Sequence, residues 1–182
     1  MKLNTMKANL DKLRESYLRY LKIYIELQNP DGKLIRTFLD SWFAYKMKGN
    51  FLTKNNIPRW FNKLNTNKLS DAEKDCLLKM NFISKDALEA INHKSDTYLM
   101  KDHSVPIKII HKLLQSDLSR SEENIEEFLN KYYRLGVLTK AEDIRLNDIK
   151  LKSDMPQDWD GNDVFARYKK AEIVRATSTM PF

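Results

Sequence analysis

The chain is organised around Tyr98-Leu99-Met100-Lys101-Asp102-His103-Ser104-Val105-Pro106, near its middle. The apolar start of this segment is too short for a helix between Ser95-Asp96 and Pro106, so it predicts a short strand. That strand ends at the Asp102-His103 pair. Pro106 favours the first position of a helix, because an amide hydrogen is not needed there. We therefore expect a strand, an acid–imidazole pair and then a helix.

A second segment has a matching pattern, Leu135-Gly136-Val137-Leu138-Thr139-Lys140-Ala141-Glu142-Asp143-Ile144-Arg145-Leu146-Asn147. Its apolar first part predicts a second short strand. Thr139 and Glu142 have the spacing of a capping box, which predicts that a helix begins there. Asp143 and Asn147 are four residues apart and would share one face of that helix.

Helical periodicity dominates the rest of the chain. Apolar residues recur at spacings of three and four over 7–28 and 33–47, and the intervening Asn29-Pro30-Asp31-Gly32 predicts a turn between two antiparallel helices. Further capping boxes are expected at Ser70 with Glu73 and at Ser119 with Glu122. Aromatic residues at helical spacing are expected in the core, although they could also stack on bases.

These patterns predict an α+β fold that is predominantly helical, with a small two-stranded β element. Two helices are expected between the two strands, and a last helix after Asn162 or Asp163. We expect a helical, basic N-terminal region over residues 1–95. Residues 96–182 would contain the two strands, the helical insertion and the C-terminal helix.

The positive charge of the chain is unevenly distributed. The formal net charge is +7, and residues 1–70 contain 14 Lys and Arg against 5 Asp and Glu. Residues 71–182 contain 18 against 20. A basic region favours a polyanionic partner, because lysine and arginine release counterions from phosphates. The alternative is an ordinary basic surface.

The composition excludes several classes of protein. The chain has 42% hydrophobic and 31% charged residues, an ordinary globular mixture. The single cysteine, Cys76, excludes an intramolecular disulfide and a cysteine-based zinc cluster. No apolar run approaches the roughly 20 residues of a membrane helix. The N-terminal residues lack the apolar core of a signal peptide, so we expect a cytoplasmic protein with no membrane partner.

The polar residues of the two segments suit metal-assisted phosphodiester hydrolysis. Asp102, Asp143 and Asn147 offer hard oxygen ligands, which favour Mg²⁺ or Mn²⁺ over Zn²⁺. His103, with an unperturbed pKa of about 6.5, could accept a proton from water at neutral pH. A structural alternative exists for Asp143, since a carboxylate in the first turn of a helix is favoured by the helix dipole. Asn147 could likewise be an exposed helical residue.

The two segments resemble the HNH, or ββα-metal, nucleases over roughly residues 97–155. Asp102-His103-Ser104-Val105-Pro106 looks like the first-strand motif of that superfamily, especially in CRISPR effector nucleases, and Val137–Asp143 looks like its strand-to-helix half. The resemblance implies a ββα-metal motif with His103 as general base and Asp102, Asp143 and Asn147 as metal ligands. It departs from the family in its long helical insertion, and the histidine-bracing asparagine has no clear counterpart.

The expected function is therefore a metal-dependent endonuclease acting on nucleic acid, more on DNA than on RNA. A homodimer would suit double-strand cleavage. Six basic residues are expected to contact nucleic acid: Lys54, Arg59, Lys63, Lys68, Lys140 and Arg145. The first four lie in an Asn-rich run that could instead be a solvated connection.

Two non-catalytic alternatives stay open. The chain could be a helical module that binds nucleic acid or an acidic partner through its basic region. It could also be a protein inhibitor, for example one encoded by a phage, that has an HNH-like shape and a protein partner.

Overall fold

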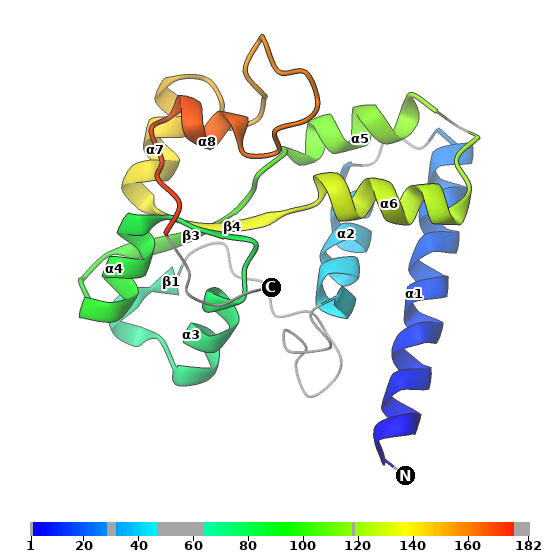
Figure 1. The fold of residues 1–182 in the computed structure, drawn as a ribbon, viewed down its shortest axis with the longest axis horizontal. Helices are drawn as coiled ribbons and strands as arrows, with labels where there is room; N and C mark the ends of the chain where they lie inside the picture. Colours follow the sequence, from blue (N-terminus) through cyan, green and yellow to red (C-terminus); the bar gives the residue numbers. More distant parts are fainter. Residues whose placement is uncertain (1, 29–31, 47–63, 118, 177–182) are drawn as a thin grey trace. The chain divides into compact units, whose positions relative to one another are not determined.

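The computed structural model describes residues 2–28, 32–46, 64–117 and 119–176. The chain divides into two compact units, each built from two separate stretches of sequence. The helical unit comprises Met1–Trp60 and Ile110–Tyr133. The sheet unit comprises Phe61–Ile109 and Arg134–Phe182. Figure 1 labels the helices α1 to α8 and the strands β1, β3 and β4 along the ribbon.

In the helical unit, α1 (Lys2–Glu26) contacts both α2 (Gly32–Lys46) and α6 (Glu122–Tyr132). The predicted helices over 7–28 and 33–47 are confirmed as α1 and α2. Their apolar stripes pack together and form the core of this unit, because this packing removes apolar surface from water. The buried apolar side chains are Leu18, Leu21, Tyr24 and Ile25 of α1, Ile35, Leu39 and Trp42 of α2, and Ile125, Phe128 and Leu129 of α6.

An ion pair and a buried hydrogen bond also join the helices of the helical unit. The Arg14 guanidinium donates to the Glu126 carboxylate of α6. The Tyr133 hydroxyl donates to the buried Asp40 carboxylate of α2 at 2.5 Å. Part of the basic charge of residues 1–70 is therefore paired with an acidic residue, Glu126, that comes much later in the chain.

The sheet unit contains a four-stranded mixed sheet in the order β1-β3-β4-β2. The two predicted strands are confirmed as β3 (Tyr98–His103) and β4 (Leu135–Thr139), which pair antiparallel. The edge strands β1 (Leu64–Asn65) and β2 (Phe82–Ile83) were not expected. The prediction of only two strands is therefore wrong, because two-residue strands are too short to show a period.

The edge strands differ in direction. β1 pairs antiparallel with β3, whereas β2 pairs parallel with β4. A short 3₁₀ helix, η1 (Thr66–Lys68), follows β1. The two helices expected between the central strands are confirmed as α5 (Ile107–Gln115) and α6.

Helix starts in the sheet unit follow the side-chain caps. Ser70 and Glu73 form a capping box at α3 (Asp71–Leu78), and Thr139 and Glu142 form another at α7 (Lys140–Asp148). Ser84 caps α4 (Lys85–His93).

The capping box expected at Ser119 is wrong. The Ser121 hydroxyl caps α6, while the Ser119 hydroxyl bonds to Asp117. The last helix, α8 (Ala166–Lys170), starts later than expected and has no side-chain cap, although the Asp163 carboxylate accepts from the Phe165 amide just before it.

Helices α7 and α8 cover one face of the sheet, as Figure 1 shows beside β3 and β4. Their buried core consists of Phe82, Leu138, Leu146, Tyr168, Ala171 and Ile173.

In the described part of the chain, no helix combines the length and apolar character needed to cross a membrane.

Candidate functional site

The two segments singled out in the sequence meet in the sheet unit. Asp102 of β3 pairs with Gly136 of β4, and His103 pairs with Leu135. Helix α7 begins directly after β4 and contacts both strands. The order of elements is therefore strand, strand and helix, with α5 and α6 inserted between the strands.

Asp102 and His103 do not share one face of the sheet. Successive side chains of a strand point to opposite faces. A Cβ atom built on Gly136, the partner of Asp102, would lie 3.0 Å from the Tyr168 hydroxyl, so this face is the one covered by α8. His103 therefore points away from it, and its side chain is only 7% exposed.

The Asp102 carboxylate is held by two side chains of α8. Its Oδ2 accepts from the Arg167 guanidinium and, at 2.8 Å, from the Tyr168 hydroxyl. The Arg167 side chain is 1% exposed and that of Asp102 is 17% exposed. Asp102 is thus the counter-ion of a buried arginine.

Arg167 uses all five of its N–H donors. Besides Asp102, it donates to four backbone carbonyl oxygens: His103 at 2.6 Å, Ser104 at 3.0 Å, Leu151 at 2.7 Å and Lys152 at 3.1 Å. It therefore joins the end of β3 to the segment that follows α7. The sequence interpretation assigned no role to Arg167. The only indication of a buried role in the sequence is the position of this arginine between Phe165 and Tyr168, two residues expected to point inward.

Burial and charge shift the pKa values in this cluster. Burial alone would lower the pKa of Arg167, but the Asp102 carboxylate keeps that pKa above its ordinary value. Burial and the same carboxylate raise the pKa of Tyr168 well above its ordinary value. Both α8 side chains therefore stay protonated and act as donors to Asp102 at neutral pH.

Asp143 of α7 is also bound to cations. Its Oδ2 accepts from Lys140 Nζ at 2.9 Å and from Lys152 Nζ at 3.1 Å. Its side chain is 7% exposed, whereas those of Lys140 and Lys152 are 43% and 48% exposed. Burial opposes ionisation of Asp143, but the hydrogen bonds and charges of the two lysines together lower its pKa.

The remaining predicted residues lie apart from these two clusters or outside the described residues. Asn147 is exposed on α7. Arg145 donates to the Ala171 and Glu172 carbonyl oxygens, at 3.3 and 3.4 Å. Lys68 is exposed at the end of η1. Lys54, Arg59 and Lys63 lie outside the described residues.

The donor groups in the sheet unit do not fit a divalent metal. Asp102 and Asp143, the two carboxylates expected to bind it, each hold positively charged side chains instead. Within the ranges that the structure describes, no three His, Cys, Asp or Glu side chains are grouped so that they could ligate one ion. Both carboxylates would have to release their cations before either could ligate a metal.

Comparisons of this chain with protein-family models, with curated proteins and with solved structures gave no match. Its function must therefore be inferred from the chemistry of its own residues.

Proposed function

We propose that this chain is a non-catalytic nucleic-acid-binding module, in which Lys140 and Lys152 hold a backbone phosphate. The observation that carries this proposal is the pairing of both ammonium groups with the single carboxylate oxygen Oδ2 of Asp143. Asp143 is nearly buried, while both lysines are about half exposed. Their ammonium groups are therefore held in defined positions and remain accessible to a ligand from solvent.

The chemistry of the lysine pair supports a phosphate ligand. Each ammonium group has three donors and uses one of them on Asp143, which leaves donors for phosphate oxygens. One carboxylate between two ammonium groups leaves a local charge of +1. Holding two flexible lysine side chains in advance lowers the entropic cost of binding.

The same contacts favour binding over catalysis. Asp102 and Asp143 were the two predicted carboxylate ligands of a catalytic metal, and both now orient cations. Contacts to phosphate oxygens do not read base identity, so we expect binding with little sequence preference.

The proposal is tested by fluorescence anisotropy with a short labelled DNA duplex at low salt. We expect Lys140→Gln/Lys152→Gln to weaken binding about tenfold, because both lysine contacts to the bound phosphate are lost. The matched control is Lys79→Gln/Lys85→Gln, which removes two lysines that also pair with carboxylates, Asp75 and Glu89. The control should change affinity less than about twofold.

Two outcomes would overturn the proposal. Equal losses in both double variants would mean that affinity reflects net charge alone. Absence of binding at low salt would mean that the lysine pair does not bind nucleic acid.

A metal-dependent nuclease is the second candidate, and the order β3, β4 and α7 favours it. Plasmid nicking with Mg²⁺ or Mn²⁺ separates the two functions. The binding module should leave plasmid intact. Cleavage by the natural chain that is lost in His103→Ala would favour the nuclease.

A further inference from the structure

A cavity lies between α8 and the segment that follows α7. Its volume is about 570 Å³, and it is lined by Ile149, Leu151, Pro156, Gln157, Asp158 and Lys170. A second hollow of about 410 Å³ shares Pro156, Asp158 and Lys170 with it and adds Trp159. Pockets of a few hundred Å³ with apolar walls and a few polar groups are typical of small-molecule sites.

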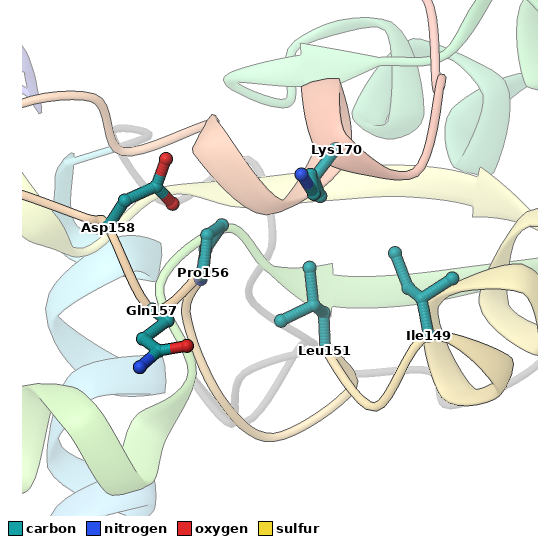
Figure 2. A pocket seen from close by; sticks show the side chains of 6 residues that line it. All are labelled: Ile149, Leu151, Pro156, Gln157, Asp158 and Lys170. Atoms are coloured by element: carbon teal, nitrogen blue, oxygen red, sulfur yellow. The ribbon is translucent and has the colours of Figure 1, made fainter.

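The end of α7 shapes one wall of this cavity. Lys150 has a φ of 61°, and the Leu151 amide donates to the Leu146 carbonyl at 2.8 Å. The Lys150 amide donates to Asn147, which completes a Schellman motif. Figure 2 shows that Ile149 and Leu151, on either side of Lys150, point toward Lys170 of α8.

Two opposite charges border the apolar wall. Within the described part of the chain, the side chains of Lys170 and Asp158 make no hydrogen bond or ion pair. The neighbouring Lys169 is different, because its Nζ lies 2.7 Å from the Asp163 carboxylate. Figure 2 shows Lys170 and Asp158 at separate positions around the cavity.

We propose that this cavity binds a small zwitterion with an apolar body, such as a free apolar amino acid. Lys170 would bind the carboxylate of the ligand and Asp158 its ammonium group. Ile149, Leu151 and Pro156 would cover its apolar side chain. This site is separate from the lysine pair at Asp143 and does not depend on nucleic-acid binding.

The presence of both charges distinguishes this ligand class from simpler ones. An apolar anion would meet Lys170 but would also face the Asp158 carboxylate, and an apolar cation would face Lys170. A zwitterion satisfies both charges and leaves the apolar surface for its side chain. The hydrophobic wall favours a large side chain such as that of phenylalanine.

NMR titration of the isotope-labelled chain tests this proposal with three related probes. L-Phenylalanine has both charges, hydrocinnamate has only the carboxylate and phenethylamine has only the ammonium group. We expect phenylalanine to bind about two- to fivefold more tightly than either analogue, as solvent-accessible ion pairs allow. The shifted amide signals should belong to residues 149–160 and to α8.

Two substitutions separate the two charges. Lys170→Gln should weaken binding of phenylalanine and hydrocinnamate but not of phenethylamine, which no longer faces a like charge. Asp158→Asn should weaken binding of phenylalanine and phenethylamine but not of hydrocinnamate, which no longer faces a like charge. Lys85→Gln, an exposed lysine of α4 that does not line the cavity, should change none of the three.

The proposal is wrong if the three probes bind equally, or if neither substitution distinguishes them. It is also wrong if none of the probes shifts the signals of the cavity residues at millimolar concentration.

Discussion

At the scale of single residues, Arg167 and its counter-ion Asp102 connect several segments of the sheet unit. A buried guanidinium is costly unless every donor is satisfied and its charge is balanced. Arg167 meets both conditions through Asp102 and four carbonyl oxygens. Asp102 is therefore more important for folding than its partial exposure suggests.

We expect Asp102→Asn to lower the free energy of unfolding by about 3 kcal/mol, because it leaves a buried cation without its counter-ion. Urea denaturation monitored by circular dichroism gives this value. The control is Glu89→Gln, which removes the partner of Lys85 at the surface and should cost about 0.5 kcal/mol or less. Similar losses in both variants would contradict a structural role for Asp102.

The lowered pKa of Asp143 makes the stability of the chain depend on pH. Its folded-state pKa is lowered, so its carboxylate stabilises the native state above the unfolded pKa of about 3.9. That contribution is lost as the pH falls through the lower, folded-state pKa. We expect the natural chain to lose more stability than Asp143→Asn between about pH 5 and pH 2. Parallel stability curves for the two proteins would contradict this assignment.

At the scale of elements, capping groups determine where helices of the sheet unit begin. Glu142 is 2% exposed and accepts from the Ser84 hydroxyl at 2.6 Å and the Thr139 amide at 2.7 Å. Ser84 caps α4 and Thr139 caps α7. One buried carboxylate thus links the starts of two helices.

The two capping boxes provide a matched comparison. We expect Glu142→Ala to lower the free energy of unfolding by about 2–3 kcal/mol, since it leaves buried donors unpaired. Glu73→Ala removes the corresponding residue from the exposed box of α3 and should cost about 0.5–1 kcal/mol. Thermal and urea denaturation measure both, and a larger loss for Glu73→Ala would contradict the role of burial.

Several helix ends among the described residues use the left-handed conformation without glycine. Glu172 follows α8 with a φ of 55°, and its side chain is exposed. We expect Glu172→Gly to raise stability by about 0.5–1 kcal/mol, because glycine adopts positive φ without strain. Glu89→Gly, inside α4, should instead lower stability by about 1 kcal/mol. Calorimetric melting temperatures should move in opposite directions.

At the scale of the whole molecule, net charge alone is a poor guide to a binding surface. Arg14 of the basic N-terminal region is paired with Glu126 of α6, so part of the positive excess of residues 1–70 is balanced by an acidic residue from a later part of the chain. The lysine pair at Asp143 lies in the second part of the chain, where acidic residues outnumber basic ones. The proposed phosphate site therefore rests on the positions of Lys140 and Lys152 and not on the overall balance of charge.

The salt dependence of nucleic-acid binding tests this view. Each phosphate contact contributes about 0.9 to the slope of log affinity against log salt. We expect Lys140→Gln/Lys152→Gln to reduce the slope by about 0.9, because the two lysines together hold one phosphate. Lys79→Gln/Lys85→Gln should leave the slope nearly unchanged. Anisotropy titrations over a series of salt concentrations measure both slopes. A smaller reduction in the first variant would mean that the two lysines do not contact phosphate.

Local patterns in the sequence determined most of the secondary structure. Apolar periodicity predicted α1 and α2, and the capping boxes at Ser70 and Thr139 placed the starts of α3 and α7. Short apolar runs predicted β3 and β4. These features depend on neighbouring residues and on partition from water, so they can be recognised without knowing the fold.

Only the tertiary structure decided what Asp102 and Asp143 bind. Folding brings their partners, Arg167 and Lys152, next to them. No spacing of residues in the sequence predicts these two ion pairs. The edge strands β1 and β2 likewise exist only because β3 and β4 are present to pair with them. The role of a carboxylate depends on which charged groups the fold places next to it. Those neighbours are set by the packing of the whole chain.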